Sequence, residues 1–194
     1  AREERTKSFV IVALGALKRT EALPVFKNAL EKGSPSEKFH SLVALGNLEK
    51  EKVPNDFDWQ LIFDVFNSED ETLIHAAILA LGTHQVKEAE NLILNFLNNK
   101  KPSLRFAAAT SLIAFKNQKA LGLLKKILLL NPNSPSAKNF SREDLLNLKT
   151  NLLEALVRED WKVLNNFIEK NLIEKQENLK LVSLARKSLK MLKN

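Results

Sequence analysis

Histidine is the side chain best suited to acid–base or metal chemistry near neutral pH, and this chain of 194 residues has three. His75 and His84 are nine residues apart, and His40 lies 35 residues before His75. No pair therefore has the i, i+4 spacing with which one helix face binds a metal. Cysteine is absent, which excludes thiolate metal sites, disulfides and a thiol nucleophile. These residues predict no metal and no cofactor.

Sequence motifs of catalysis are also missing. The chain has no G-x-S-x-G, no P-loop, no G-x-G-x-x-G and no H-E-x-x-H. The remaining candidates for chemistry are two Asp–Trp neighbours, in which Trp59 follows Asp58 and Trp161 follows Asp160. At comparable helix positions other segments carry leucine or phenylalanine, so we expect both tryptophans to pack in the core. The sequence predicts a protein that is not an enzyme.

Charge is distributed unevenly along a chain whose net charge is +7. Residues 51–100 hold three basic and nine acidic side chains, whereas residues 101–150 hold nine basic and two acidic ones. The basic cluster comprises Lys101, Arg105, Lys116, Lys119, Lys125, Lys126, Lys138 and Arg142. Aromatic residues are not interleaved with these charges as base-stacking platforms would require. Nucleic acid is therefore a possible partner, but a less favoured one than protein.

The ends and the hydropathy of the chain give weaker indications. No apolar run approaches the 18 residues of a membrane span. The sequence begins without an initiator Met and without an apolar leader segment, and we expect a processed chain or a fragment. We expect a cytoplasmic location, because no feature argues for export.

An internal repeat organises the sequence. Ala-Leu-Gly occurs at residues 13–15, 44–46 and 80–82, and Ser111-Leu112-Ile113 occupies the same place in a fourth copy. The anchor leucines are Leu14, Leu45, Leu81, Leu112, Leu153 and Leu189, separated by 31, 36, 31, 41 and 36 residues. Because three of the five glycines recur at one repeat position, we interpret them as sites of close helix packing.

Each signature ends an amphipathic helix, and a second helix follows after a short polar turn. The predicted second helices span residues 21–31, 56–66, 87–98, 119–130 and 161–172. The predicted N-caps are Ser34, Ser68 and Ser141, each three residues before a carboxylate, and Asn55. Residues 131–139 read as the one long loop, and no segment reads as a strand.

Helix pairs that recur every 30–40 residues form an α-solenoid, because one pair cannot bury its own apolar face. The Ala-Leu-Gly copies, each followed by an L-x-x-L/F helix, resemble HEAT repeats, in particular the short HEAT-like units of the phycobilisome-lyase type. The resemblance covers essentially the whole chain and weakens in the last two copies. It predicts an all-α solenoid of stacked antiparallel helix pairs, with about 11 helices in a single array over residues 1–194. Its units lie at residues 1–19, 20–50, 55–84, 87–116, 118–157 and 160–194.

In HEAT-like arrays the signature helices form the inner, concave layer, and the resemblance implies that a partner binds there. Off their main stripe these helices carry two columns, Ser8, Phe39, His75, Phe106 and Ile11, Leu42, Ile78, Ala109. Either neighbouring helices cover the columns or they form an apolar groove. We expect Phe39 and Phe106 to anchor a protein or peptide partner, with His75 beside them and Arg105 as a charged contact. The acidic middle and the basic second half would then fix the direction of an amphipathic partner segment.

Two other functions remain open at this point. Some DNA glycosylases for alkylated bases are built from HEAT-like helices with tryptophans and a catalytic Asp, but no longer motif of that family is matched. The lyase-type repeats suggest an accessory role in cofactor attachment. The favoured function is a non-enzymatic HEAT-repeat scaffold for protein–protein interaction, in an oligomeric state that the sequence leaves open.

Overall fold

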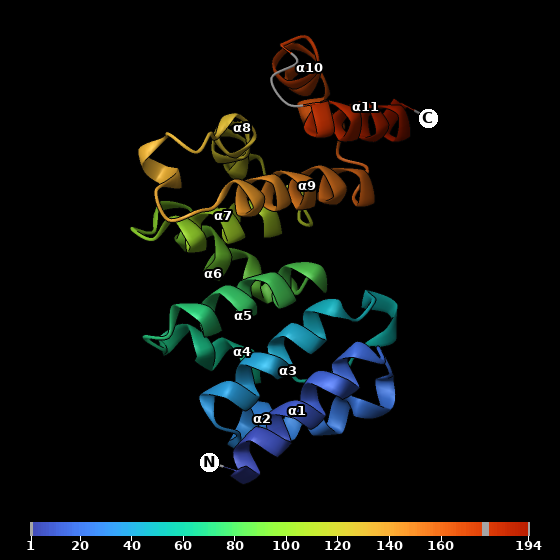
Figure 1. Ribbon diagram of the computed structural model, residues 1–194. Helices are drawn as coiled ribbons and strands as arrows, with labels where there is room; N and C mark the ends of the chain where they lie inside the picture. Colours follow the sequence, from blue (N-terminus) through green and yellow to red (C-terminus); the bar gives the residue numbers. More distant parts are fainter. Residues whose placement is uncertain (1, 176–178, 194) are drawn as a thin grey trace. The chain divides into compact units, whose positions relative to one another are not determined.

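The computed structural model describes residues 2–175 and 179–193, and this part of the chain contains eleven α-helices and no β-strand (Figure 1). The helices are α1 (Arg2–Ala16), α2 (Leu23–Lys32), α3 (Pro35–Asn47), α4 (Gln60–Phe63), α5 (Glu71–Thr83), α6 (Glu90–Asn95), α7 (Pro102–Ser111), α8 (Leu121–Leu129), α9 (Arg142–Arg158), α10 (Asn165–Ile168) and α11 (Leu179–Lys193). The predicted all-α class and the number of helices are confirmed.

Short 3-10 turns extend most of the second helices. The predicted helix at residues 87–98, for example, consists of the turn Lys87–Ala89, α6 and the turn Phe96–Asn98. A further 3-10 turn, Pro135–Ala137, lies inside the predicted loop at 131–139. Among the described residues no helix is long and apolar enough to cross a membrane.

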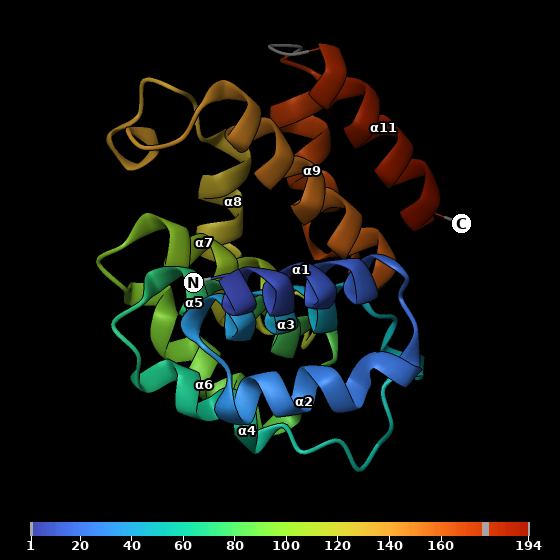
Figure 2. The same ribbon diagram turned by 60° about the horizontal axis from the view of Figure 1, so that its bottom comes forward.

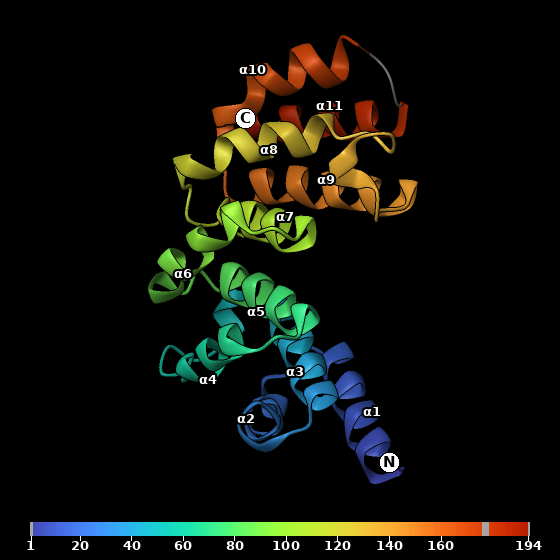
Figure 3. The same cartoon turned by 90° about the vertical axis from the view of Figure 1, so that its left-hand side faces the viewer.

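The chain forms two compact units, unit 1 (Ala1–Ile93) and unit 2 (Leu94–Asn194). In unit 1 the signature helices α1, α3 and α5 lie side by side, since α1 packs on α3 and α3 on α5. Helices α2 and α4 form a second layer on one side of these three, as Figures 2 and 3 show. This two-layer arrangement leaves the opposite side of α1, α3 and α5 uncovered by the unit's own second helices.

Unit 2 repeats the pattern with α7, α9 and α11 as signature helices. Helix α9 packs on α7 and on α11, while α8 packs on α7 and α9 (Figure 3). Helix α10 and the following π-helical turn, Glu169–Ile173, pack on α11. Each unit is thus an array of helix pairs, and one continuous array over residues 1–194 stays a prediction.

The helix starts follow the capping residues in two cases and differ in two. Ser34 and Ser141 each form a capping box, in which the serine hydroxyl accepts from the N3 backbone and the N3 carboxylate accepts from the serine N–H. The predicted cap at Ser68 is wrong, because Asp70 caps α5 by accepting from Thr72 N at 2.9 Å. Ser68 instead accepts from the N–H of Asp70 at 3.0 Å.

The predicted helix at residues 56–66 also begins later than expected. Helix α4 starts at Gln60, whose N–H donates to Asp58 Oδ1 at 3.1 Å, so the predicted cap at Asn55 is wrong. Phe57 N donates to Pro54 O at 3.0 Å and closes a turn before the helix. A turn at Pro54 therefore forms in place of the first part of the helix expected in this segment.

The ends of three signature helices share one backbone motif. The N–H of Val86, Asn117 and Trp161 donates to the carbonyl of Leu81, Leu112 and Leu156, at 3.1, 3.1 and 2.9 Å. The residue before each donor has a positive φ: Gln85 52°, Lys116 50° and Asp160 44°. This pattern is the Schellman motif, which normally has glycine or asparagine at the left-handed position.

The shared motif corrects the register of the fifth repeat. Its anchor is Leu156, three residues after the predicted Leu153, because Leu156 accepts the same bond as Leu81 and Leu112. Both leucines are fully buried, so apolar spacing alone does not distinguish them.

Five of the six anchor leucines lie in the core. Leu45, Leu81, Leu112, Leu153 and Leu189 are buried, and Leu14 on the first helix is half-buried. Trp161 is buried as well, and Trp59 stacks on the ring of His84 at 4.9 Å between centroids. Both tryptophans therefore have packing roles.

Candidate interaction face

An exposed row of apolar side chains crosses the uncovered side of unit 1. Val12 on α1, Val43 on α3 and Leu79 on α5 occupy the same position in three successive repeats. Their exposed fractions are 46, 41 and 38%. We call these three residues the apolar row. Exposure of large apolar side chains at equivalent positions on adjacent helices produces a contiguous patch, and such patches mark interaction sites.

Close helix packing brings the members of the row together. A Cβ atom built on Gly15 of α1 would lie 2.7 Å from the Cβ of Ala44 on α3. A Cβ built on Gly46 of α3 would lie 3.6 Å from the Cα of Ala80 on α5. The Ala-Leu-Gly glycines at these two places thus allow the three backbones to approach closely, as their repetition predicted.

A shallow hollow continues the row at the end nearer the N-terminus. Its volume is about 380 Å³, and its lining residues come from α1 and α3: Arg5, Ser8, Phe9, Val12, Ser36 and His40. The hydroxyl oxygens of Ser8 and Ser36 lie 3.1 Å apart and join the two helices. Phe9 is 73% exposed. Aromatic residues are enriched at the hot spots of protein interfaces, so an exposed ring beside a hollow suits partner binding.

Two of the predicted partner-binding residues lie on this face. Phe39 and His75 are half-buried and lie four residues before Val43 and Leu79, one helical turn away. Burial lowers the pKa of His75 below its ordinary value of 6.5, so the ring is neutral at pH 7. Phe39 and His75 therefore flank the apolar row as a partly accessible border.

The other two predicted residues lie in unit 2 and have contacts of their own. Phe106 is 3% exposed and its ring packs on Phe140, at 5.6 Å between centroids, so the expectation of an accessible anchor is not met. The guanidinium of Arg105 donates to the carbonyl oxygens of Asn99 and Lys100, at 2.7 and 3.1 Å. Arg105 consequently holds the turn that precedes α7.

The second predicted column belongs to the core. Ile11, Leu42, Ile78 and Ala109 are all at most 3% exposed. Neighbouring helices cover this column, which was the first of the two alternatives given by the sequence. The accessible apolar column is the apolar row itself, which lies one residue after this buried column on α1, α3 and α5.

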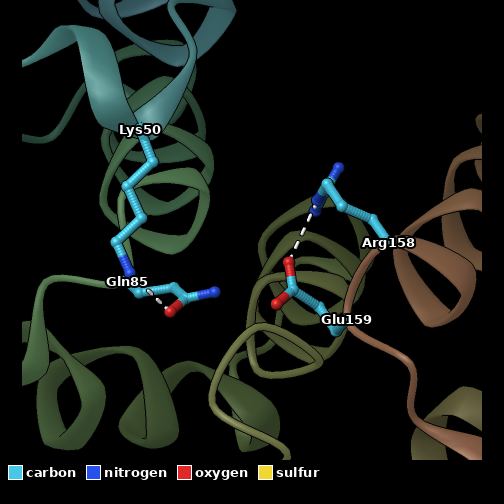
Figure 4. A network of polar contacts seen from close by, with 4 residues as sticks. All are labelled: Lys50, Gln85, Arg158 and Glu159. Carbon is cyan, nitrogen blue, oxygen red and sulfur yellow. Dashed lines mark hydrogen bonds and ion pairs between the residues drawn. The ribbon is translucent and has the colours of Figure 1, made fainter.

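A polar contact between repeats supports the far end of the face. His84 ends α5, is 5% exposed and lies with Nε2 2.8 Å from the carbonyl oxygen of Leu45. Since a carbonyl only accepts, Nε2 carries the proton and donates. Burial lowers the pKa of His84, and the bond to Leu45 partly offsets that effect. Next to it, Lys50 Nζ donates to Gln85 Oε1 at 2.7 Å (Figure 4).

The acidic and histidine side chains of the described residues lie apart from one another. Within residues 2–175 and 179–193, no three His, Asp or Glu side chains come together as a possible metal site. Asp160 lies exposed in the turn after α9, where Lys162 pairs with its carboxylate at 3.5 Å. In the same turn, Arg158 Nε donates to Glu159 Oε1 at 3.0 Å (Figure 4). These side chains stabilise a helix end, which accounts for the Asp–Trp neighbour at Asp160.

Sequence reasoning missed the apolar row itself, together with Phe9. The signal was available, because position 12 of the first repeat is valine, and the equivalent positions 43 and 79 are valine and leucine. A helix that is apolar on most sides does not reveal which column its neighbours leave open. Only the placement of α2 and α4 against α1, α3 and α5 decides it.

The helix pairs of both units define a helical-repeat protein of the α-solenoid class. Residues 60–138 match the family model for HEAT repeats, so this segment of the chain is similar to HEAT repeats. The matched segment begins with α4 and ends just after the turn that follows α8. No curated protein matches the chain significantly in sequence. The finer likeness to lyase-type repeats stays a prediction.

Proposed function

We propose that the chain is a non-enzymatic scaffold that binds a protein partner through the uncovered side of α1, α3 and α5. HEAT repeats are commonly protein-interaction scaffolds and are typically not enzymes. The observation that carries the proposal is the apolar row, with exposed fractions of 46, 41 and 38% at equivalent positions in three repeats. In the adjacent column Ile11, Leu42 and Ile78 are at most 3% exposed, so on these three helices the row is accessible where the neighbouring column is covered.

The composition of the face favours a partner with an apolar stripe. The row supplies aliphatic side chains, and Phe9 supplies a ring that is 73% exposed. Arg5, Ser36 and His40 border the hollow beside that ring and provide hydrogen-bonding groups at its edge. An amphipathic helix laid across α1, α3 and α5 would bury its apolar side chains on the row, which is the helix-in-groove mode of recognition.

The test compares partner capture by two matched triple variants. Val12→Glu, Val43→Glu and Leu79→Glu together charge the apolar row. The control carries Val25→Glu, Leu129→Glu and Val163→Glu, whose side chains are 39, 48 and 42% exposed on other elements. Both variants add the same charge and remove similar apolar surface.

Affinity capture from a lysate of the source cells should yield proteins that wild type and control retain and the row variant loses. Circular dichroism should show the same helical content for all three proteins. A partner retained by the row variant, or lost equally by the control, would refute the proposal.

A further inference from the structure

Unit 2 contains an open groove of about 840 Å³ on elements other than those of the apolar row. One wall is formed by residues 94–100, from the end of α6 through the turn Phe96–Asn98. A second wall is formed by α8 with its flanking residues Lys119 and Leu130, and Arg105 and Phe106 of α7 also line the groove. This size is typical of sites that hold a small molecule or a peptide segment.

The lining of the groove combines positive charge with an apolar floor. Its charged members are Lys100, Arg105, Lys119 and Lys126, and no Asp or Glu is among its lining residues. Its apolar members are Leu94, Leu97, Phe106, Leu123 and Leu130, all buried or half-buried. The groove therefore suits a ligand that is both acidic and apolar.

The lysines of the groove are available to such a ligand. Lys100, Lys119 and Lys126 are exposed, and among the described residues none of the three forms an ion pair. Lys126 lies on α8, and Lys119 lies in the 3-10 turn Gln118–Ala120 that precedes this helix. Arg105 positions Lys100 through its bond to that residue's carbonyl, at 3.1 Å.

A glycine without a packing role lies on α8 between these two lysines. A Cβ atom built on Gly122 would meet no other heavy atom within 4 Å, whereas those on Gly15 and Gly46 would contact the next helix. Glycine inside a helix costs about 0.5–1 kcal/mol relative to alanine. Packing within the protein does not account for that cost, but close approach of a ligand's backbone at the centre of the groove does.

We propose that this groove binds an acidic amphipathic segment of a partner protein. The apolar side chains of the segment contact the leucine floor, and its carboxylates pair with Lys100, Lys119 and Lys126. Its backbone passes closest to Gly122. A nucleic acid fits less well, because the one aromatic ring of the lining, Phe106, is 3% exposed and offers no surface for base stacking.

The experiment is a fluorescence anisotropy titration of the full chain with a labelled amphipathic peptide of about four helical turns, roughly 14 residues. The peptide has leucine on one face and glutamate on both flanks, and a second peptide has glutamine in place of every glutamate. At about 0.1 M salt the glutamate peptide should bind at least roughly tenfold more tightly than the glutamine peptide.

Two pairs of variants assign the binding to the groove. Lys119→Glu with Lys126→Glu should weaken binding at least about tenfold, whereas Lys125→Glu with Lys138→Glu, which changes net charge equally outside the lining, should change it less than about threefold. Gly122→Ala, which adds a methyl group where the segment's backbone passes closest, should weaken binding, and Gly122→Phe, which obstructs the groove, should lose it. Circular dichroism checks that every variant remains folded.

Three results would overturn the proposal: no preference for the glutamate peptide, full binding by Gly122→Phe, or tighter binding of an oligothymidylate of similar length. The variant charged at the apolar row should still bind the glutamate peptide. Failure of the groove and failure of the scaffold function are therefore distinguishable.

Discussion

Replacement of Gly15 by alanine tests how closely the signature helices of unit 1 pack. The added methyl group would lie 2.7 Å from the Cβ and 3.3 Å from the Cα of Ala44. Carbon atoms in contact prefer separations of about 3.5–4.0 Å, so α1 would have to move away from α3. Such overpacking typically costs about 1–3 kcal/mol, against a gain of about 0.5–1 kcal/mol from replacing glycine inside a helix.

Gly46 provides the matched control for this substitution. Its added methyl group would find its nearest neighbour, the Cα of Ala80, at 3.6 Å, which is an ordinary contact. Gly46→Ala should therefore stabilise the chain by about 0.5–1 kcal/mol through helix propensity alone. The free energies of unfolding of the two variants should differ by about 1–3 kcal/mol, with Gly15→Ala the less stable.

Urea denaturation followed by circular dichroism measures both values. In the double variant Gly15→Ala with Ala44→Gly, the closest clash is removed, so the two substitutions should be coupled favourably by about 0.5–3 kcal/mol. If Gly15→Ala stabilises as much as Gly46→Ala, the helices do not approach as the structure describes, and the reasoning about the apolar row loses its basis.

Three further predictions concern stability. Leu81 is fully buried, and Leu81→Ala should cost about 2–5 kcal/mol in urea denaturation; a loss below about 0.5 kcal/mol would contradict its core role. Lys116 has a φ of 50°, a left-handed conformation that glycine adopts at lower cost, so Lys116→Gly should raise the free energy of unfolding by about 0.5–1 kcal/mol. No gain in urea denaturation would contradict that conformation. Burial lowers the pKa of His75 and His84 below 6.5, so the stability they contribute is present above that pH and lost as pH falls through the lowered values. His75→Gln with His84→Gln should flatten unfolding free energies measured from about pH 7 to pH 5, and an unchanged slope would refute this assignment.

The sequence predicts the repeat fold because its determinants are local and periodic. Leu81 and Leu112 can be recognised by their place in Ala-Leu-Gly-like copies, and both are fully buried. The carboxylate three residues later correctly marks Ser34 and Ser141 as caps, although the same signal at Ser68 misplaces the cap by two residues. The Leu156 anchor could not be found in this way, because Leu153 satisfies the same apolar pattern and only the turn at Asp160 fixes the register.

The candidate site was less predictable, since it depends on which helix faces remain open. Phe106 and Val43 lie on signature helices, and both are apolar, but Phe140 covers the first and the structure leaves the second 41% exposed. The residue covering Phe106 comes from the loop before α9, more than 30 positions away in sequence. A repeat pattern carries no information about such long-range coverage.

Methyl NMR on the full chain, labelled at valine and leucine, tests the scaffold function most directly. On addition of a captured partner, the methyl resonances of Val12, Val43 and Leu79 should shift or broaden together. Those of Val25 and Val163, exposed on other elements, should stay in place. Perturbation confined to Val25 or Val163, with an unchanged apolar row, would contradict partner binding on α1, α3 and α5.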